Sequence, residues 1–181
     1  MDAIALDAQE RMSKSIESLK SSLSTLRTGR ANAQMLSGID VDYYGSPTPI
    51  NQIASISIPE PRQLLIKPYD KNDVKSIVSA INASDLGINP INEGTCVRLI
   101  IPALTEDRRR DIVKQAKKYG EEAKISIRNI RRDYMDLVKM DEEMSEDYQK
   151  RVQDDIQKVT DEMSKKIDVI VSEKEKEIMT V

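Results

Sequence analysis

The sequence predicts an α+β protein in which an elongated antiparallel three-helix bundle is interrupted by a small inserted domain. All seven prolines and five of the six glycines lie between residues 29 and 102. Because proline and glycine disfavour helix interiors, the flanking residues 1–28 and 105–181 are expected to be helical. We therefore expect a discontinuous bundle formed by residues 1–29 and 105–181, and an inserted β/α/β domain over residues 30–104.

Three helices are predicted by apolar residues that recur at alternating spacings of four and three. Thr105 and Ser145 precede acidic residues and are expected to cap the second and third helices. The connection "KMDEEM" is short and polar, which indicates that these two helices lie antiparallel. The expected buried positions are Met12, Ile16, Leu19, Leu23 and Leu26 in the first helix, Ala116, Gly120, Ala123, Ile127, Ile130, Tyr134 and Leu137 in the second, and Val152, Ile156, Val159, Met163, Ile167 and Ile170 in the third.

The insert is predicted to contain short strands and one helix. The helix is expected within residues 70–87, with Val74, Ile77, Val78 and Ile81 facing inward. The glycine-bounded stretch "GINPINEG" that follows is expected to be a turn. The expected strands are residues 38–45 and 54–59, where apolar and polar residues alternate, and 63–68 and 96–102, which are apolar runs ending at proline.

The composition offers little for catalysis. The chain has no histidine, which removes the usual acid or base at neutral pH and the commonest metal ligand. Its single cysteine, Cys96, excludes an intrachain disulfide and a cysteine-type zinc site. No phosphate-binding loop or dinucleotide-binding glycine motif occurs. We therefore expect no enzyme activity, no cofactor and no metal.

The expected location is the cytoplasm. A single unpaired thiol fits a reducing compartment. The chain has no run of about 18 apolar residues, so no membrane span is expected. Its start carries acidic residues and no apolar stretch of the kind found in signal peptides.

Basic residues concentrate on the second helix, although the formal net charge of the chain is −3. Residues 114–132 hold seven basic and two acidic side chains, whereas residues 141–181 hold seven basic and thirteen acidic ones. Arg128, Arg131 and Arg132 fall within five positions. Helical spacing places the basic residues in a stripe beside the buried face.

Two interpretations of this stripe remain open from spacing alone. It could form ion pairs with the acidic third helix, although exposed pairs contribute only about 0–1 kcal/mol each. It could instead bind the phosphate backbone of a structured nucleic acid, since arginine suits bidentate contact with phosphate. Base stacking is not expected, because the chain has few aromatic residues.

A protein partner is the alternative from another functional class. In that case the chain would be a helical interaction protein or a chaperone-like protein whose basic stripe meets an acidic surface. Weak dependence of binding on salt would favour this alternative, because phosphate contacts release counterions and make affinity strongly salt-dependent.

Further basic residues lie at the expected junction of the two domains. Arg27 and Arg30 flank Gly29, and Arg108, Arg109 and Arg110 open the second helix. N-terminal capping of the insert and ligand contact both remain open for these residues. A hinge is expected here, because Gly29 permits unusual backbone angles and two connections join the domains.

Seven segments of the chain match one known family. They are "LRTGRA" at 26–31, "YYGSPTPINQIASI" at 43–56, "ASDLGINP" at 83–90, "PALTEDRRRDIVK" at 102–114, "RNIRRD" at 128–133, "SEDYQKRVQDDIQKVTD" at 145–161 and the final "EKEKEIM". Through these segments the sequence resembles the ribosome recycling factor family over essentially its whole length. The segment "VKMDEEMSED" departs from the resemblance, being a few residues shorter than in some members.

The resemblance implies an L-shaped, non-enzymatic translation factor whose long arm is the bundle. It implies that the factor binds the ribosome at the subunit interface after termination. With elongation factor G and GTP, it would split the ribosome into subunits. We expect a monomer with no membrane partner.

The resemblance also implies which residues act. Arg128, Arg131 and Arg132 match the arginine cluster that contacts large-subunit ribosomal RNA, with Arg131 as the principal residue. Further RNA contacts are expected at Arg27, Arg30 and Arg109. The expected hinge residues are Gly29, Ala31, Pro102, Ala103 and Leu104.

Overall fold

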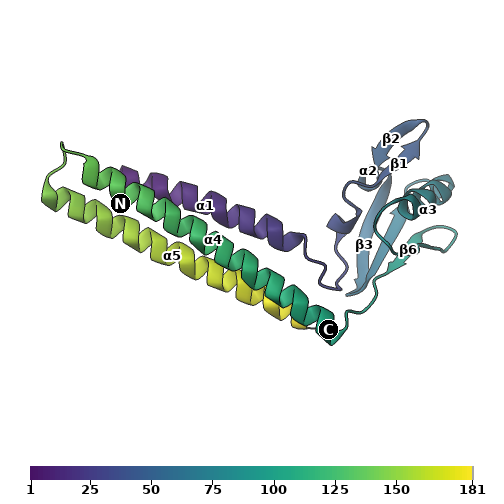
Figure 1. The fold of residues 1–181 in the computed structure, drawn as a ribbon. Helices are drawn as coiled ribbons and strands as arrows, with labels where there is room; N and C mark the ends of the chain where they lie inside the picture. Colours follow the sequence, from purple (N-terminus) through teal and green to yellow (C-terminus); the bar gives the residue numbers. More distant parts are fainter. Residues whose placement is uncertain (181) are drawn as a thin grey trace. The chain divides into compact units, whose positions relative to one another are not determined.

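The computed structural model describes residues 1–180 and divides into two compact units. The first unit consists of Met1–Thr28 and the chain from Thr105 onwards, and the second is Gly29–Leu104. Gly29, which we expected to end the first helical segment of the bundle, groups with the insert. The α+β class, with a three-helix bundle and a small sheet-containing unit, is confirmed (Figure 1).

The first unit is an elongated bundle of three helices: α1 (Ala3–Ser24), α4 (Glu106–Met140) and α5 (Glu146–Met179) (Figure 1). A helix of 35 residues such as α4 is roughly 50 Å long. The connection between α4 and α5 is short, and the two helices run antiparallel as expected.

Helix α1 ends four residues before Thr28, so the prediction that residues 1–28 are all helical is wrong at its end. The hydroxyl groups of Ser24 and Thr25 donate to the carbonyl groups of Ser21 and Ser22, each at 2.6 Å. These side chains compete with the backbone for the last carbonyl groups of the helix. Leu26 therefore lies beyond α1 and is only half-buried.

The predicted caps of the two long helices are confirmed. The Thr105 hydroxyl accepts a hydrogen bond from the Arg108 backbone N–H at 3.2 Å, and the Ser145 hydroxyl accepts one from Tyr148 at 3.3 Å. Acidic residues occupy the first turn of both helices, where their negative charge interacts favourably with the positive end of the helix dipole.

Most of the predicted seam is buried, but its far end on α4 was predicted wrongly. Leu137 is 60% exposed, and Val138 is fully buried in its place. A straight helix drifts by about 20° per heptad relative to a strict seven-residue repeat. After three heptads the buried position has therefore moved one residue along. Ile130 and Ile170 are half-buried.

Two contacts fix α1 against α4. The hydroxyl groups of Ser15 and Ser126 lie 2.9 Å apart. The buried Tyr134 donates its hydroxyl to the carboxylate of Asp7, and burial together with this bond raises the pKa of Tyr134. Antiparallel packing follows, because residues early in α1 meet residues late in α4.

Gly120 marks a close approach of α4 and α5. A Cβ atom at this position would lie 2.7 Å from Cγ2 of Val171, which is closer than van der Waals contact allows. The absence of a side chain at Gly120 therefore lets the two helices pack at this distance.

The second unit is built from a hairpin, a four-stranded antiparallel sheet and short helices. The hairpin pairs β1 (Asp40–Tyr43) with β2 (Ser46–Pro49). Helix α3 (Val74–Ala83) buries Val74, Ile77 and Ile81 in the core of the unit. The larger sheet has the order β3-β4-β6-β5, with the bounds Ala54–Glu60 for β3, Gln63–Pro68 for β4, Ile91–Asn92 for β5 and Val97–Ile100 for β6.

Sequence analysis missed several short elements of this unit. Strand β2 has the sequence "SPTP". Proline is disfavoured in strands other than edge strands, and this segment lacks the alternation of apolar and polar residues that predicts a strand. Strand β5 lies inside the stretch that we expected to be only a turn. The four-residue helix α2 (Ile50–Ile53) and the 3₁₀ turn Ala33–Leu36 were also missed. The predicted helix over residues 70–87 is shorter, because Asp70 caps a separate 3₁₀ turn at Lys71–Asp73.

We predict that Gly120→Leu destabilises the bundle by about 2 kcal/mol, because the new side chain must push α5 away. Urea unfolding followed by circular dichroism measures this change. Glu121→Leu introduces the same side chain at an exposed neighbour, where surface substitutions change stability by about 0.5 kcal/mol or less. Equal midpoints for the two variants would contradict the close packing at Gly120.

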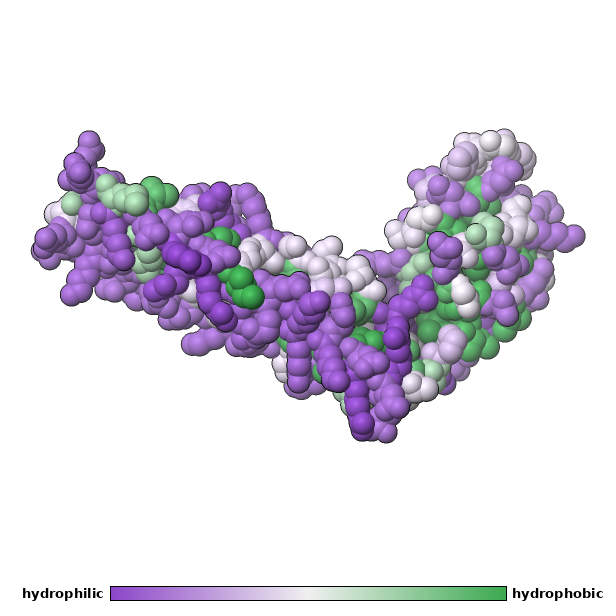
Figure 2. Space-filling view, in the orientation of Figure 1, coloured by the Kyte–Doolittle hydropathy of each residue, from purple (hydrophilic) through white to green (hydrophobic). Residues whose placement is uncertain are grey.

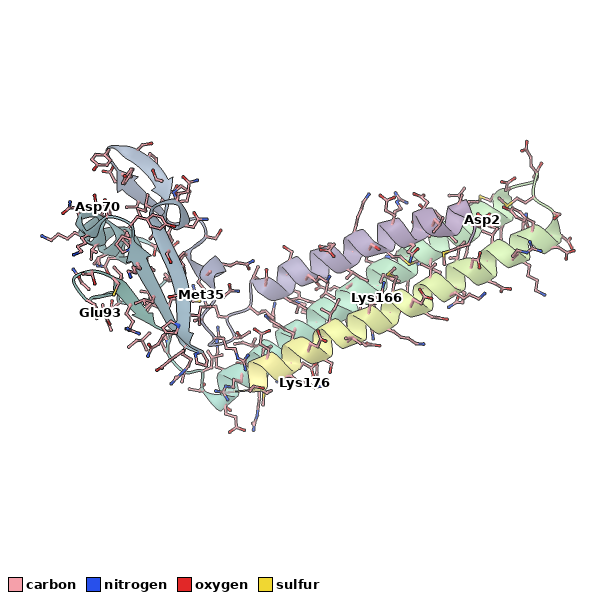
Figure 3. All side chains as sticks on the ribbon, turned by 180° about the vertical axis from the view of Figure 1, so that it is seen from behind. Asp2, Met35, Asp70, Glu93, Lys166 and Lys176 are labelled. Carbon is pink, nitrogen blue, oxygen red and sulfur yellow. The ribbon has the colours of Figure 1, made fainter. Side chains whose placement is uncertain are left out.

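Asp2 ties the start of α1 to α5 (Figure 3). Its carboxylate accepts hydrogen bonds from the Tyr148 hydroxyl and from the Ile4 backbone N–H, the latter at 2.8 Å. Its own backbone N–H donates to Asp155 at 3.2 Å. The hydrogen bond from Tyr148 and then that from Ile4 lower the pKa of Asp2 from its ordinary value of 3.8.

We predict that Asp2→Ala lowers the free energy of unfolding by about 1 kcal/mol at pH 7, since a helix cap is lost. A lowered pKa in the folded state means that the carboxylate stabilises the fold above its ordinary pKa of 3.8. This contribution is lost as the pH falls through the folded-state value. Thermal unfolding over an acidic pH series should therefore show the two proteins converging. A constant difference through that range would refute the role of the ionised carboxylate.

Candidate nucleic-acid interface

The three clustered arginines lie on the middle of α4. Arg128 and Arg132 are exposed, and Arg131 is half-buried at the boundary with α5. Each of the buried residues Ile127 and Tyr134 lies within a turn of the cluster and anchors this part of α4 in the bundle. The arginines therefore project from a helix whose backbone is held on its other side by the core.

Arg131 is oriented by a side chain of α5. Its Nε donates to Oε1 of Gln157 at 2.7 Å. The other end of the same amide donates from Nε2 to the carboxylate of Asp161 at 2.9 Å. Within residues 1–180, the two terminal nitrogens of Arg131 make no hydrogen bond, so they are available to a ligand.

Arg132 is also held by an amide. Its Nη2 donates to Oδ1 of Asn129 at 2.9 Å, one turn earlier on the same helix. No carboxylate in the described part of the chain lies within ion-pair distance of Arg128, Arg131 or Arg132. None of the three arginines is therefore engaged in an ion pair within the described residues.

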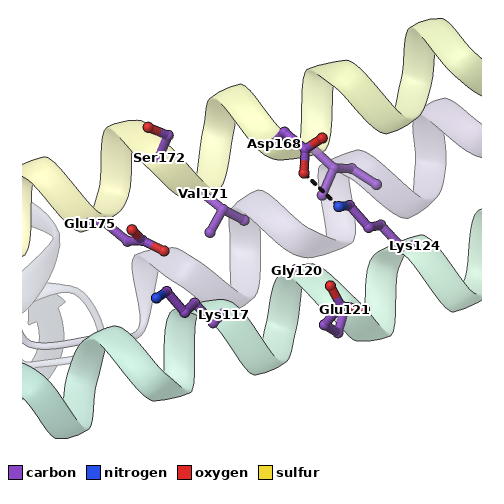
Figure 4. Close-up of a pocket in the computed structure, with 9 residues that line it drawn as sticks. Lys117, Gly120, Glu121, Lys124, Asp168, Val171, Ser172 and Glu175 are labelled. Atoms are coloured by element: carbon purple, nitrogen blue, oxygen red, sulfur yellow. Dashed lines mark ion pairs between the residues drawn. The ribbon is translucent and has the colours of Figure 1, made fainter.

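Some other cations of the protein do have carboxylate partners. Lys124, on the same stripe of α4, pairs with Asp168 of α5 at 2.5 Å (Figure 4). Near the start of α4, Arg110 pairs with Glu106 at 2.9 Å. The interpretation that the stripe pairs with the acidic third helix therefore holds for Lys124 and fails for the arginine cluster.

The insert contains an arginine in a different arrangement. Arg98 donates to Glu93 at 2.6 Å and to Gln63 at 2.7 Å, and the bond to Arg98 lowers the pKa of Glu93. Cys96 donates its thiol to Glu93 at 3.3 Å, and burial raises the pKa of this thiol. The thiol stays protonated and the ion pair fastens β6 to the preceding loop, so this cluster is structural.

A groove of about 370 Å³ runs between α4 and α5 beside Gly120 (Figure 4). Lys117 and Lys124 line it, but Glu121, Asp168 and Glu175 lie among them and offset their charge. With cationic and anionic side chains mixed in this way, the groove does not add to the uncompensated charge of the arginine cluster.

The second group of predicted arginines is spread over three places. Arg27 is exposed just after α1, Arg30 is exposed in the second unit, and Arg109 is half-buried in the first turns of α4. Among residues 1–180, none of these three side chains donates a hydrogen bond. N-terminal capping of the insert by these arginines is therefore not supported.

The predicted hinge residues lie where the chain passes between the two units. Gly29 has a φ of +77°, and a Cβ atom there would lie 3.1 Å from Cγ of Leu104. The Ala31 backbone N–H donates to the Pro61 carbonyl at 2.8 Å. Pro102 and Ala103 are exposed and lie outside any helix or strand.

Sequence analysis missed the amides that hold the cluster. Asn129 stands three residues before Arg132, a spacing at which helical side chains meet, and this signal was available. Gln157 could not be found in the same way, because its contact with Arg131 depends on the register of α4 against α5.

Figure 2 shows one face of the molecule, on which the bundle is covered mostly by hydrophilic residues with small apolar groups between them. Among the described residues, no three or more histidine, cysteine or acidic side chains are arranged to hold a metal ion. No helix over residues 1–180 combines the length and apolarity that crossing a membrane requires.

Known proteins match this chain along nearly its full length. The family model described as "Ribosome recycling factor" matches residues 19–179. The ribosome-recycling factor of Staphylococcus carnosus is 52% identical over 100% of both chains, and that of Streptococcus pyogenes serotype M28 is 54% identical over 99% of both. These similarities place the chain in a class of translation factors that are not enzymes.

Solved structures show the same likeness. A solution structure of a ribosome recycling factor is 40% identical, with a TM-score of 0.78 over 98% of this chain and 96% of the other. A model of the Thermus thermophilus factor, described with Escherichia coli elongation factor G bound to the E. coli post-termination complex, is 43% identical with a TM-score of 0.63 over 98% and 97%. The chain belongs to the ribosome recycling factor family, and its function is ribosome recycling in protein biosynthesis.

Proposed function

We propose that the chain binds large-subunit ribosomal RNA through Arg128, Arg131 and Arg132. In this account it splits the post-termination ribosome into subunits together with elongation factor G and GTP. The observation that carries the proposal is a cluster of three arginines on one rigid helix with no carboxylate partner in residues 1–180. Such a cluster attracts phosphate, because guanidinium groups make bidentate, charge-assisted hydrogen bonds with it.

The partners are proposed from the relatives. A structure of a related factor is described with elongation factor G on the post-termination complex, and this chain is 43% identical to it over 98% of its length. We propose that this chain meets the same partners in the cytoplasm, as a monomer. GTP would be used by the elongation factor, since this family does not consist of enzymes.

The mode of RNA contact follows from the surface chemistry. Residues 128–132 contain no aromatic side chain, so the cluster offers no aromatic ring on which bases could stack. Contacts to phosphate and to the shape of a folded RNA remain. Helix α5 carries ten acidic and seven basic residues, and this excess of negative charge would repel phosphate from its surface and favour the cluster as the contact.

Arg27, Arg30 and Arg109 are proposed as further RNA contacts. They are free of hydrogen bonds within the described residues, which fits a role in binding a ligand. A hinge formed by Gly29, Ala31, Pro102, Ala103 and Leu104 would let the second unit move while the bundle stays on the RNA.

We predict that Arg131→Ala reduces splitting of purified post-termination ribosomes by about tenfold or more, since it removes a phosphate contact. Light scattering with elongation factor G and GTP follows the splitting directly. The fold should survive, because the lost bond to Gln157 contributes only about 1 kcal/mol.

Lys124→Ala is the matched control for this experiment. It removes one positive charge from the same stripe, but that charge is already paired with Asp168. Splitting by wild type and by Lys124→Ala, but not by Arg131→Ala, would support the anchor. Splitting by all three would keep the function and move the RNA contact elsewhere, and splitting by none would refute the proposed function.

We predict that Gly29→Val impairs splitting more than it impairs ribosome binding. Valine is strained at a φ of +77°, and its Cβ atom would press on Leu104. Gly38→Val is the control, because Gly38 also has a positive φ but has no atom within 4 Å of an added Cβ. Normal splitting by Gly29→Val, with Gly38→Val equally active, would argue against a hinge at this position.

A further inference from the structure

The hydrogen bonds around Arg131 form a chain with only one consistent direction. A guanidinium group has donors and no acceptor, and a carboxylate has acceptors and no donor. The amide of Gln157 lies between them, so its oxygen must face Arg131 and its nitrogen must face Asp161, as the distances of 2.7 and 2.9 Å show. Asp161 therefore sets the orientation of the amide that Arg131 meets.

This arrangement leaves the outer edge of the guanidinium free. Only Nε of Arg131 is engaged, by a single bond to Gln157. The two terminal nitrogens together form the edge that can grip two oxygens of one phosphate. Gln157 thus restricts the rotation of the guanidinium plane without occupying that edge.

A neutral partner also leaves the charge of Arg131 intact. Elsewhere in the protein, two arginines form ion pairs: Arg98 meets Glu93, in addition to the amide of Gln63, and Arg110 meets Glu106. In the cluster the partners are amides instead, Gln157 for Arg131 and Asn129 for Arg132. The side chains are held in place, but their attraction for phosphate is not cancelled.

We propose that Gln157, oriented by Asp161, is a positioning residue that presents Arg131 to ribosomal RNA phosphate without neutralising it. This inference rests on the proposed function of the arginine cluster. Asn129 is likewise a neutral partner of Arg132, but it engages the terminal nitrogen Nη2 and so does not leave both terminal nitrogens free. The Gln157 amide lies between Asp161 and Arg131, so the carboxylate of Asp161 is bonded to the amide and not to Arg131.

A charge swap tests the proposal. The double variant Gln157→Glu with Asp161→Asn keeps the net charge of the chain and keeps one amide and one carboxylate at the two positions. It places the carboxylate against Arg131. Binding to purified large ribosomal subunits should weaken by about tenfold, and the log–log dependence of affinity on salt should become shallower by about one. Unchanged affinity and an unchanged slope would overturn the proposal.

Two further variants separate this inference from the proposed function. If Arg131→Ala binds the subunits as tightly as wild type, the arginine anchor itself is wrong, and the role of Gln157 fails with it. If Arg131→Ala binds weakly but the charge swap binds like wild type, only the positioning role is wrong. Adding the swap to Arg131→Ala should cause no further loss, because Gln157 acts through Arg131; an additional loss would contradict that route.

The orientation can be measured in the free protein. The Nε–H group of Arg131, assigned by its loss in Arg131→Lys, should give a protected signal in ¹H–¹⁵N spectra because it is hydrogen-bonded. Gln157→Leu should remove this protection and weaken subunit binding. The free energy of unfolding should stay within about 1 kcal/mol of wild type. Protection that persists in Gln157→Leu would overturn the geometry on which the proposal depends.

Discussion

The packing of α4 against α5 is the constraint on which the functional surface depends. Gly120 lets the two helices approach until Val171 would touch any added side chain. Buried residues such as Ile127 and Ile156 then hold the register along the interface. That register brings Gln157 to Arg131 and Asp168 to Lys124. A shift by one residue along α5 would replace Gln157 with Ile156 or Lys158, so the partners of the surface cations follow from the packing beneath them.

The distribution of charge resolves the apparent contradiction of an acidic protein that is proposed to bind an anionic partner. The net charge of −3 conceals a basic α4, with eleven basic and seven acidic side chains, beside an acidic α5, with seven basic and ten acidic ones. Where carboxylates of α5 or of α4 itself reach a cation, they cancel it, as at Lys124 and Arg110. Where the partner is an amide, as it is for Arg131 and Arg132, the partner does not cancel the charge of the arginine. The proposed RNA contact therefore depends on which partner each cation meets, and the total charge of the chain says little about it.

Much of the bundle could be predicted from the sequence, because the period of the apolar residues and the capping residues indicate where helices lie. Thr105 and Ser145 were identified from the acidic residues behind them, and the seam was wrong at Leu137 only after drift had accumulated over three heptads. The insert was harder to predict. Strand β2 carries two prolines and β5 has two residues, so neither shows a period that sequence analysis can detect.

In the candidate site, too, some residues could be predicted from the sequence and others could not. The arginines of α4 could be named from their spacing and from the family resemblance. Their partners could not, since Gln157 lies 26 residues from Arg131 and meets it only across two helices. Spacing alone also left ion pairing and phosphate binding equally open for the stripe. The choice needed the distances, which assign Lys124 to Asp168 and leave the three arginines without a carboxylate in residues 1–180.

The central claim is that uncompensated arginines on α4 bind ribosomal RNA phosphate. The most direct measurement is the affinity of the wild-type chain for purified large ribosomal subunits over a series of salt concentrations. Contact with about four phosphates predicts a log–log slope of about −3 to −4. A slope near zero would contradict the claim and would favour a protein surface as the partner of the bundle.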